Sequence, residues 1–194
     1  NQALAEPMDS VRKMKFFKKL IEVGYKEIEV GFPSASDTDF NFIRELINDG
    51  HIPDDVTIQV LTQSREELII KTIDSLKGSK NAIIHLYNST STLQRKVVFK
   101  EDMNGVKKIA TDGAKIISDN IGVLNNTNVR LEYSPESFTG TELPYALEVC
   151  EEILDVWEAN ELKPVIINLP ATVEMSSPNV YADQIEWMRK NFSD

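Results

Sequence analysis

Apolar residues recur along the chain with two alternating periods. Runs rich in β-branched residues, with apolar side chains at alternate positions, predict strands at 27–32, 56–61, 81–87, 129–133 and 164–169. Longer segments with apolar residues at i, i+3, i+4 and i+7 predict amphipathic helices at 9–23, 38–49, 65–77, 103–122, 142–158 and 179–191. The polar segment 88–102 predicts a long irregular connection between a strand and a helix.

Strands that alternate with helices at intervals of roughly 30 residues predict a parallel sheet with right-handed crossovers. Five strands fit either an open doubly wound sheet or part of a closed barrel. No glycine-rich loop follows any of the predicted strands, which makes a dinucleotide-binding sheet a weak interpretation. The pattern therefore favours an α/β barrel.

Composition indicates a soluble, cytoplasmic domain with one sizeable core. The chain has 194 residues, of which 41% are hydrophobic and 27% charged. It contains no apolar run of membrane-spanning length and opens with no signal-peptide pattern. A net charge of −10 argues against a nucleic-acid partner, which requires a basic surface. The single cysteine, Cys150, falls on the apolar face of a predicted helix and is expected to be buried.

One segment stands out as a place for chemistry. The strand 129–133 is followed by a predicted loop that carries Ser134 and Glu136, and a helix is expected to open at Thr141. Loops after the carboxyl ends of parallel strands carry the active sites of barrel enzymes, so Glu136 is a candidate acid, base or metal ligand. The alternative is a capping loop, in which Ser134 and Glu136 satisfy helix amides.

Polar residues also interrupt the apolar alternation within the other strands. Glu29, Gln59, His85 and Glu132 each lie between apolar neighbours, and Asn168 and Thr172 lie at the carboxyl end of the last strand. Buried polar groups of this kind must be hydrogen-bonded, so a structural network inside a barrel explains them as well as a binding site does. For His85 the structural alternative is a core histidine bonded to a backbone carbonyl.

Longer motifs identify a family resemblance. They are Asn-Gln-Ala-Leu at 1–4, Lys-Glu-Ile-Glu-Val-Gly-Phe-Pro-Ser-Ala-Ser at 26–36, His-Leu-Tyr-Asn-Ser-Thr-Ser at 85–91, Tyr-Ser-Pro-Glu at 133–136, Asn-Leu-Pro-Ala-Thr-Val-Glu at 168–174 and Pro-Asn-Val-Tyr-Ala-Asp at 178–183. In this order they resemble the 2-isopropylmalate synthase family over essentially the whole chain. The resemblance implies a (β/α)₈ TIM barrel that condenses acetyl-CoA with 2-oxoisovalerate in leucine biosynthesis. It also implies a divalent metal, Mg²⁺ or Mn²⁺ or alternatively Zn²⁺, and a complete enzyme that is a homodimer.

The resemblance also implies roles for individual residues. Glu136 matches a glutamate invoked in proton transfer, and Glu29 matches a carboxylate that orients a substrate-binding arginine. The residues that match the lining of the oxo-acid pocket are Leu61, His85, Ser134 and Thr172. Gln2 matches a glutamine beside the metal-binding segment.

The chain departs from the family at its metal ligands. The family's Arg-Asp-Gly tripeptide stands immediately before the residues that match Asn1 and Gln2, and its His-x-His motif lies on the seventh strand. Residues 1–194 are therefore expected to be a partial catalytic barrel domain, helix 1 through helix 6 with five parallel strands and two unpaired edges. This fragment is expected to contain none of the metal ligands, to bind no metal and to lack activity alone.

Other functions stay open at this point. Citramalate and homocitrate synthases and aldol-cleaving lyases share the resemblance, and the chain is alternatively a non-catalytic folded module or one that dimerises through its open edges. Homocitrate synthases place an arginine two residues before the serine that matches Ser134, to pair with a second substrate carboxylate. Here that position is Glu132, which would repel a dianionic acid. Leu61 adds an apolar wall suited to a branched alkyl group.

Overall fold

The computed structural model describes residues 4–193, so the predicted site residue Gln2 lies outside the described residues. Its five strands form one parallel sheet whose spatial order follows the chain order. The strands are β1 (Glu27–Gly31), β2 (Thr57–Gln63), β3 (Asn81–Ser89), β4 (Asn128–Glu136) and β5 (Val165–Ile167). A sequential parallel order without closure is the order of a barrel interrupted on both sides, which confirms the predicted incomplete barrel.

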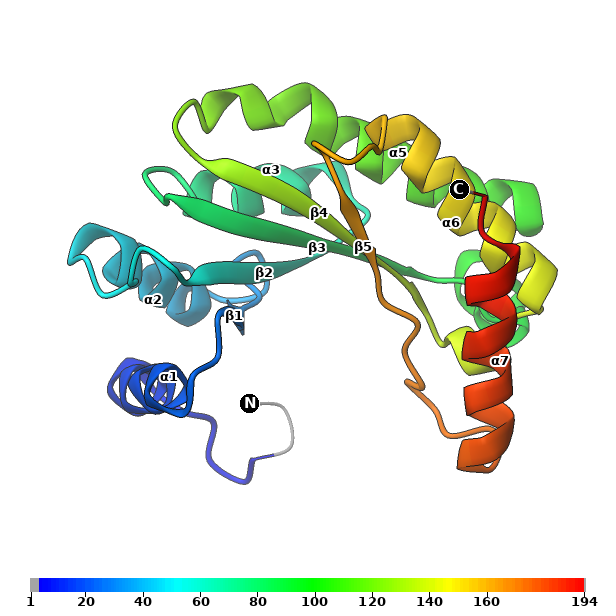
Figure 1. The fold of residues 1–194 in the computed structure, drawn as a ribbon, viewed down its shortest axis with the longest axis horizontal. Coiled ribbons are helices and arrows are strands. Elements are labelled where there is room, and N and C mark those ends of the chain that lie inside the picture. The colour runs from blue at the N-terminus through cyan, green and yellow to red at the C-terminus, as the bar shows by residue number, and fades with distance from the viewer. Residues whose placement is uncertain (1–3, 194) are drawn as a thin grey trace.

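Helices connect the strands and cover one face of the sheet. They are α1 (Ser10–Val23), α2 (Asp37–Asn48), α3 (Glu66–Ser75), α4 (Thr92–Gln94), α5 (Met103–Asn120), α6 (Leu143–Trp157) and α7 (Pro178–Asn191). Shorter elements are the π-helix η1 (Arg95–Phe99) and the 3₁₀ turns η2 (Ile121–Val123) and η3 (Phe138–Gly140). Figure 1 shows the sheet as an arch, with α3, α5 and α6 along its outer side and α1 and α7 at its two ends.

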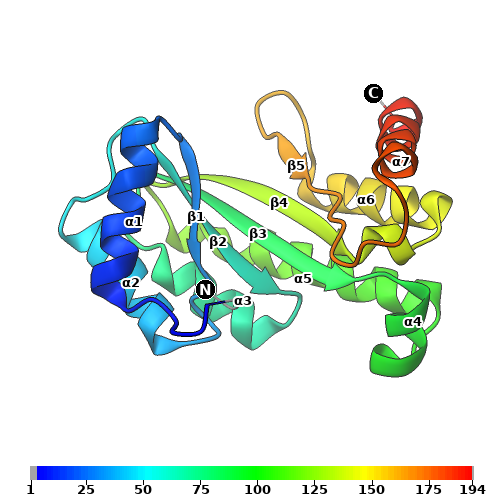
Figure 2. The same ribbon diagram turned by 90° about the horizontal axis from the view of Figure 1, so that it is seen from below.

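The two-residue period of the strands divides the sheet into an apolar and a polar face. Side chains on the helix-covered face include Ile58, Val60, Ile84, Leu86 and Leu131, and all five are fully buried. Alternate positions on the other, concave face carry Glu29, Gln59, His85, Glu132 and Ser134. Figure 2 looks onto this concave face, with the covering helices behind it. The core therefore lies between sheet and helices, and the polar residues lie on the opposite side.

Local signals explain where the helices begin. Asp9, Ser36 and Asp102 each cap a helix by accepting a hydrogen bond from a first-turn amide. Gly24 ends α1 in a left-handed conformation, φ +108°, which glycine adopts without a steric penalty. No helix within residues 4–193 is long and apolar enough to cross a membrane.

The predicted loop at Ser134 and Glu136 is wrong, because both residues belong to β4. The strand continues because β3 also continues, pairing Tyr87 with Ser134 and Ser89 with Glu136.

Pro135 is compatible with this strand for a geometric reason. The Tyr133 carbonyl bonds toward the β5 side and the Glu136 carbonyl toward the β3 side, so alternation places the missing amide proton of Pro135 toward β5. The pairing of β4 with β5 ends at Tyr133. No ladder hydrogen bond toward β5 is therefore lost at Pro135, which has no amide proton to donate.

The connection at 88–102 is also more ordered than the sequence predicts. It contains the end of β3, the short helix α4 and the π-helix η1. The sequence gives no helical signal at η1, because its buried residue is the charged Arg95 while the apolar Val97 and Val98 are exposed.

Candidate functional site

Four neighbouring strands bring their polar side chains together on the concave face. Glu29 lies on β1, Gln59 on β2, His85 on β3 and Ser134 on β4, and residues of adjacent parallel strands at similar heights face one another. His85 pairs in register with Glu132, and Glu29 with Gln59. The sheet itself therefore assembles residues that are up to 105 positions apart in the sequence.

His85 is the centre of this network. Its Nδ1 lies 2.8 Å from Glu29 Oε2, and the same carboxylate oxygen accepts a 2.9 Å hydrogen bond from Gln59 Nε2. On the other side of the ring, Nε2 lies 2.7 Å from Ser134 Oγ and 3.4 Å from Glu132 Oε1. The histidine is thus held by side chains of β1 and β4, not by the backbone carbonyl that the structural alternative predicts.

The hydrogen-bond partners indicate one consistent proton arrangement. Ser134 Oγ accepts a 2.8 Å hydrogen bond from Asn168 Nδ2, so its own hydroxyl proton is available to donate to His85 Nε2. His85 Nδ1–H then donates to Glu29, whose carboxylate fixes the ring. The chain Asn168–Ser134–His85–Glu29 is therefore a continuous relay of donors across the sheet.

The same groups resemble a serine–histidine–carboxylate relay, but their environment favours binding. Ser134 is only 3% exposed and its oxygen already has two partners. A nucleophilic serine needs an accessible oxygen beside an oxyanion-binding site. We therefore interpret Ser134 and His85 as rigid hydrogen-bonding groups in the wall of a pocket. The alternative that Ser134 caps a helix is wrong, since its hydroxyl contacts His85 and Asn168.

The two carboxylates nearest His85 have opposite electrostatic environments. Burial alone would raise the pKa of Glu29, but hydrogen bonds from His85 and Gln59 outweigh it and lower that pKa below its ordinary value. Burial raises the pKa of Glu132, and the neighbouring charge of Glu29 adds to this effect although His85 opposes it. The network therefore holds one firmly ionised carboxylate and one that is easier to protonate.

Glu136 and Thr172 form the rim above this network. Glu136 is the last residue of β4, on the same face as Ser134, and burial raises the pKa of its carboxyl group. Thr172 Oγ1 accepts a 2.9 Å hydrogen bond from the amide of Ser137, the residue after Glu136. A half-buried carboxyl of raised pKa at the end of a barrel strand is suited to accept or donate a proton.

Leu61 lies apart from the hydrogen-bonded network but on the same side of the sheet. It pairs in register with His85 and lines a cavity of about 550 Å³ beside the free edge of β1. The cavity is also lined by Glu29 and by apolar side chains of α1, including Phe16 and Phe17. Leu61 thus supplies an apolar surface next to the charged end of the network.

Sequence reasoning placed Gln59, Glu132 and Asn168 near the site but gave Asn168 no role. It gave no role to Ser137, which follows Glu136, or to Arg95 and Glu142, which pair between the connections after β3 and β4. Ser137 has no sequence signal, because its conformation is left-handed although it is not a glycine. Arg95 and Glu142 are 47 positions apart, and their contact depends on the folded connections.

Cys150, in α6, is fully buried as predicted, and burial raises the pKa of its thiol to about 12.

Within residues 4–193, no group of three or more histidine, cysteine, aspartate or glutamate side chains could hold a metal ion.

The fold and site define a class of protein: an unclosed parallel α/β barrel with polar and ionisable groups gathered at the carboxyl ends of its strands. The family profile described as HMGL-like matches residues 1–194. The chain belongs to the HMGL-like family.

Comparison with individual proteins shows which members of this family the chain resembles. The chain is 64% identical over 194 residues to a protein of Parafrankia sp. (strain EAN1pec), and 61% identical over 191 residues to one of Renibacterium salmoninarum. It is 56% identical over 191 residues to a protein of Parvibaculum lavamentivorans. All three are named 2-isopropylmalate synthase, and the matches cover 98–100% of this chain. The chain spans about a third of the length of these relatives, 33% or 34%. The resemblance predicted from the motifs is confirmed.

Proposed function

We propose that this chain is part of the catalytic barrel of a 2-isopropylmalate synthase, which condenses acetyl-CoA with 2-oxoisovalerate. The observation that carries the proposal is the juxtaposition of Glu136 with the Ser134–His85–Glu29 network at the carboxyl ends of the strands. The names of the relatives support it, since they match nearly the whole chain.

The reaction needs a proton to leave the methyl group of a thioester, and Glu136 is the group we assign to that step. Its raised pKa brings the carboxyl closer to neutrality, where a base is most effective in proton transfer. Its place on the rim leaves it reachable, while the deeper residues are tied into hydrogen bonds. Glu136 would take the methyl proton as the enolate forms. It would give a proton to the oxyanion that remains when the enolate carbon adds to the ketone carbon of the oxo acid, and hydrolysis of the thioester by water would then release the thiol.

Ser134, His85, Thr172 and Leu61 would hold the oxo acid. Asn168 and Glu29 fix the side chains of Ser134 and His85 in place, so little reorganisation of this pocket wall is needed when the oxo acid binds. Leu61 would contact the branched alkyl group. Glu29 orients His85 here; its role toward an arginine stays a prediction.

A divalent metal, Mg²⁺, Mn²⁺ or alternatively Zn²⁺, would supply Lewis-acid chemistry in such an enzyme. No group of three or more ligand-type side chains gathers among the residues described here, so we assign no step to the metal. That residues 1–194 lie in one catalytic domain of a cytoplasmic homodimer also stays a prediction from the resemblance.

The proposal is tested by Glu136→Gln in the full-length protein. We expect kcat for 2-oxoisovalerate-dependent thiol release from acetyl-CoA to fall by about 10²–10⁴-fold, the usual contribution of a general base. The melting temperature should not fall, because glutamine avoids the cost of keeping an ionised carboxylate half-buried. Glu161→Gln, at an exposed position, is the matched control and should leave both quantities unchanged. Near-normal turnover of Glu136→Gln would remove Glu136 from the mechanism.

A further inference from the structure

The backbone immediately after Glu136 is in an uncommon conformation. Ser137 has φ 57° and ψ 39°, the left-handed region that non-glycine residues rarely adopt. Such residues persist where the surrounding structure holds them, and they concentrate at functional sites. The direction of the chain at Glu136 therefore depends on what fixes Ser137.

Two connections hold Glu136 and Ser137 from opposite sides. On the β3 side, the Glu136 carbonyl accepts hydrogen bonds from Thr90 N (3.1 Å) and Ser89 Oγ (3.2 Å). On the α6 side, the Ser137 carbonyl accepts one from Thr141 Oγ1 (3.1 Å). The hydroxyl oxygens of Thr90 and Thr141 lie 2.9 Å apart, so the two connections also contact each other.

Arg95 joins the same two connections through its guanidinium group. Its Nη1 donates to the Thr90 carbonyl (2.6 Å) and to Glu142 Oε2 (2.9 Å), and its Nη2 donates to Glu142 Oε1 (2.7 Å). The group also lies 4.8 Å from the centre of the Tyr145 ring. Only 8% of the Arg95 side chain is exposed, so this is a bidentate ion pair shielded from water on the arginine side.

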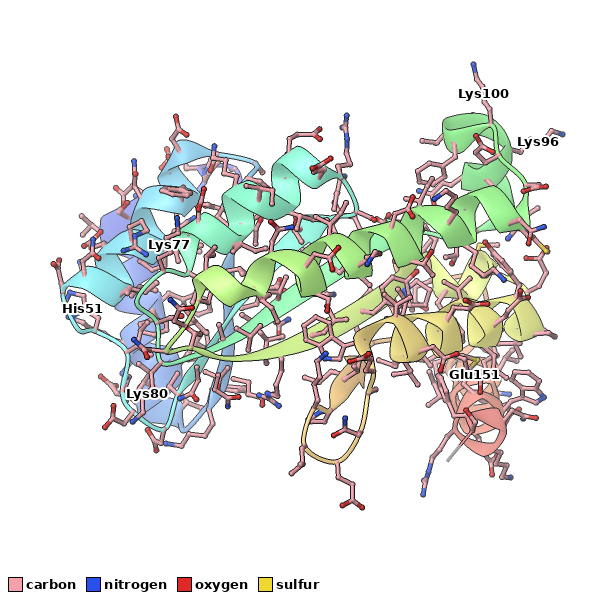
Figure 3. All side chains as sticks on the ribbon, turned by 90° about the horizontal axis from the view of Figure 1, so that it is seen from above. His51, Lys77, Lys80, Lys96, Lys100 and Glu151 are labelled. Atoms are coloured by element: carbon pink, nitrogen blue, oxygen red, sulfur yellow. The ribbon has the colours of Figure 1, made fainter. Side chains whose placement is uncertain are left out.

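The π-helix η1 delivers Arg95 to this position. In Figure 3 Lys96 and Lys100, from the same short segment, extend outward at its tip, whereas Arg95 is buried. π-Helical turns are rare and are frequent at functional sites. The hydrogen bond from Arg95 lowers the pKa of Glu142 despite partial burial, so the carboxylate stays ionised and the pair stays intact near neutral pH.

We propose that the Arg95–Glu142 ion pair positions Glu136. The pair joins the β3–α4 and β4–α6 connections, holds Ser137 in its left-handed conformation and thereby fixes the direction of the Glu136 side chain. This inference rests on the proposed function, in which Glu136 transfers the proton. Arg95 and Glu142 act through Glu136 and touch no reacting atom.

Glu142→Gln and Arg95→Lys in the full-length protein test the proposal. Both substitutions keep a polar side chain but remove the bidentate charge pair. We expect kcat to fall roughly 10- to 100-fold, because small misplacements of a reacting group cost about this much, while KM for the oxo acid changes little. Asp112→Asn breaks the exposed Lys108–Asp112 pair and is the matched control, with unchanged kinetics.

A double-substitution cycle separates positioning from general destabilisation. When Glu142→Gln is added to Glu136→Gln, we expect no further loss of kcat, because the positioned group is already absent. A further loss equal to that of Glu142→Gln alone would overturn the proposal, since the ion pair would then act independently of Glu136.

Amide hydrogen exchange gives a readout that does not depend on activity. Peptides covering 134–142 should exchange faster in Glu142→Gln than in the unchanged protein, whereas peptides from β2 should not. Unchanged exchange at 134–142 would overturn the proposal. If the full-length protein released no thiol, the proposed function would fail, and the exchange data would still decide whether the ion pair holds this segment.

Discussion

Glu29 and Glu132 show how neighbouring residues of one type acquire different properties. Both carboxylates lie within 3.4 Å of His85 and both interact with Gln59, but the charges of Glu29 and Glu27 also repel the ionised form of Glu132. Burial outweighs the favourable contacts at Glu132, so its pKa is raised while that of Glu29 is lowered. The difference comes from partners across the sheet and is invisible in the sequence around either residue.

Glu132→Gln should make the protein more stable at neutral pH. Because the folded-state pKa of Glu132 is above its ordinary value of 4.5, the folded protein binds more protons than the unfolded chain between these two values. Stability is therefore lost as pH rises through this window, and glutamine avoids that loss. Melting curves of the full-length protein should show a higher midpoint for the variant at pH 7 and no difference below pH 4.5.

Glu29→Gln is the matched comparison, with the opposite sign. Its lowered pKa means that the ionised form contributes stability above the ordinary carboxyl pKa, and that this contribution is lost as pH falls through the folded-state value. The variant should thus be less stable than the unchanged protein at pH 7. Equal or reversed shifts for the two variants would contradict the assigned environments.

At the residue scale, the sequence predicts which side chains share a face but not which of them are bonded. The two-residue period suffices to place Glu29, His85 and Ser134 on one side of the sheet. The partnership of Asn168 with Ser134, and of Arg95 with Glu142, depends on how the connections fold. The roles of these residues toward substrate stay predictions.

At the scale of elements, the predicted strands and helices all occur, and their ends shift by a few residues. The largest differences are at Ser134–Glu136 and at 88–102. The first difference, and the strand pairing of Asn88 and Ser89, arise because β3 and β4 extend each other, which no local pattern reports. The helical turns α4 and η1 account for the rest of 88–102. The consequence is functional, since Glu136 lies on a strand and not on a loop, and strand positions hold side chains more rigidly.

The packing of α5 against the sheet can be tested at Gly113, where the helix approaches the sheet closely. A Cβ atom at Gly113 would lie 3.0 Å from Ser64 Cβ and 3.3 Å from Leu86 Cδ1, and closer still to Ser64 Oγ. Overpacking usually costs about 1–3 kcal/mol, and the helix propensity of alanine over glycine returns roughly 1 kcal/mol of this. Gly113→Ala should therefore destabilise the protein by up to about 2 kcal/mol net.

Gly122→Ala is the control for this experiment. Nothing lies within 4 Å of a Cβ atom built at Gly122, so the substitution should be neutral or slightly stabilising in denaturant-induced unfolding. If Gly113→Ala proved as stable as the unchanged protein, the close packing of α5 on β3 would be contradicted.

At the scale of the whole molecule, the sheet is open on both sides and its concave face carries the polar site. The edges of β1 and β5 lack strand partners among residues 4–193, and the cavity beside Leu61 borders the edge of β1. Since the chain spans about a third of its relatives, the activity we propose belongs to the full-length protein. The motifs predicted this architecture because they resemble a family; the periodicity alone left an open sheet possible.

The side chains on the concave face predict which oxo acid the full-length protein prefers. Glu132, whose side chain is 10% exposed beside His85, offers no cation for a second substrate carboxylate. Leu61 adds an apolar surface nearby, and one methyl group in such a wall discriminates by only about 1–3 kcal/mol. The pocket should thus reject a dianionic oxo acid strongly and a shorter alkyl chain only moderately.

The most direct measurement is kcat/KM of the full-length protein for thiol release from acetyl-CoA with 2-oxoisovalerate, pyruvate and 2-oxoglutarate. We expect 2-oxoisovalerate to be preferred over 2-oxoglutarate by a wide margin and over pyruvate by a smaller one. A preference for 2-oxoglutarate or pyruvate, or no thiol release with any of the three acids, would contradict the assignment.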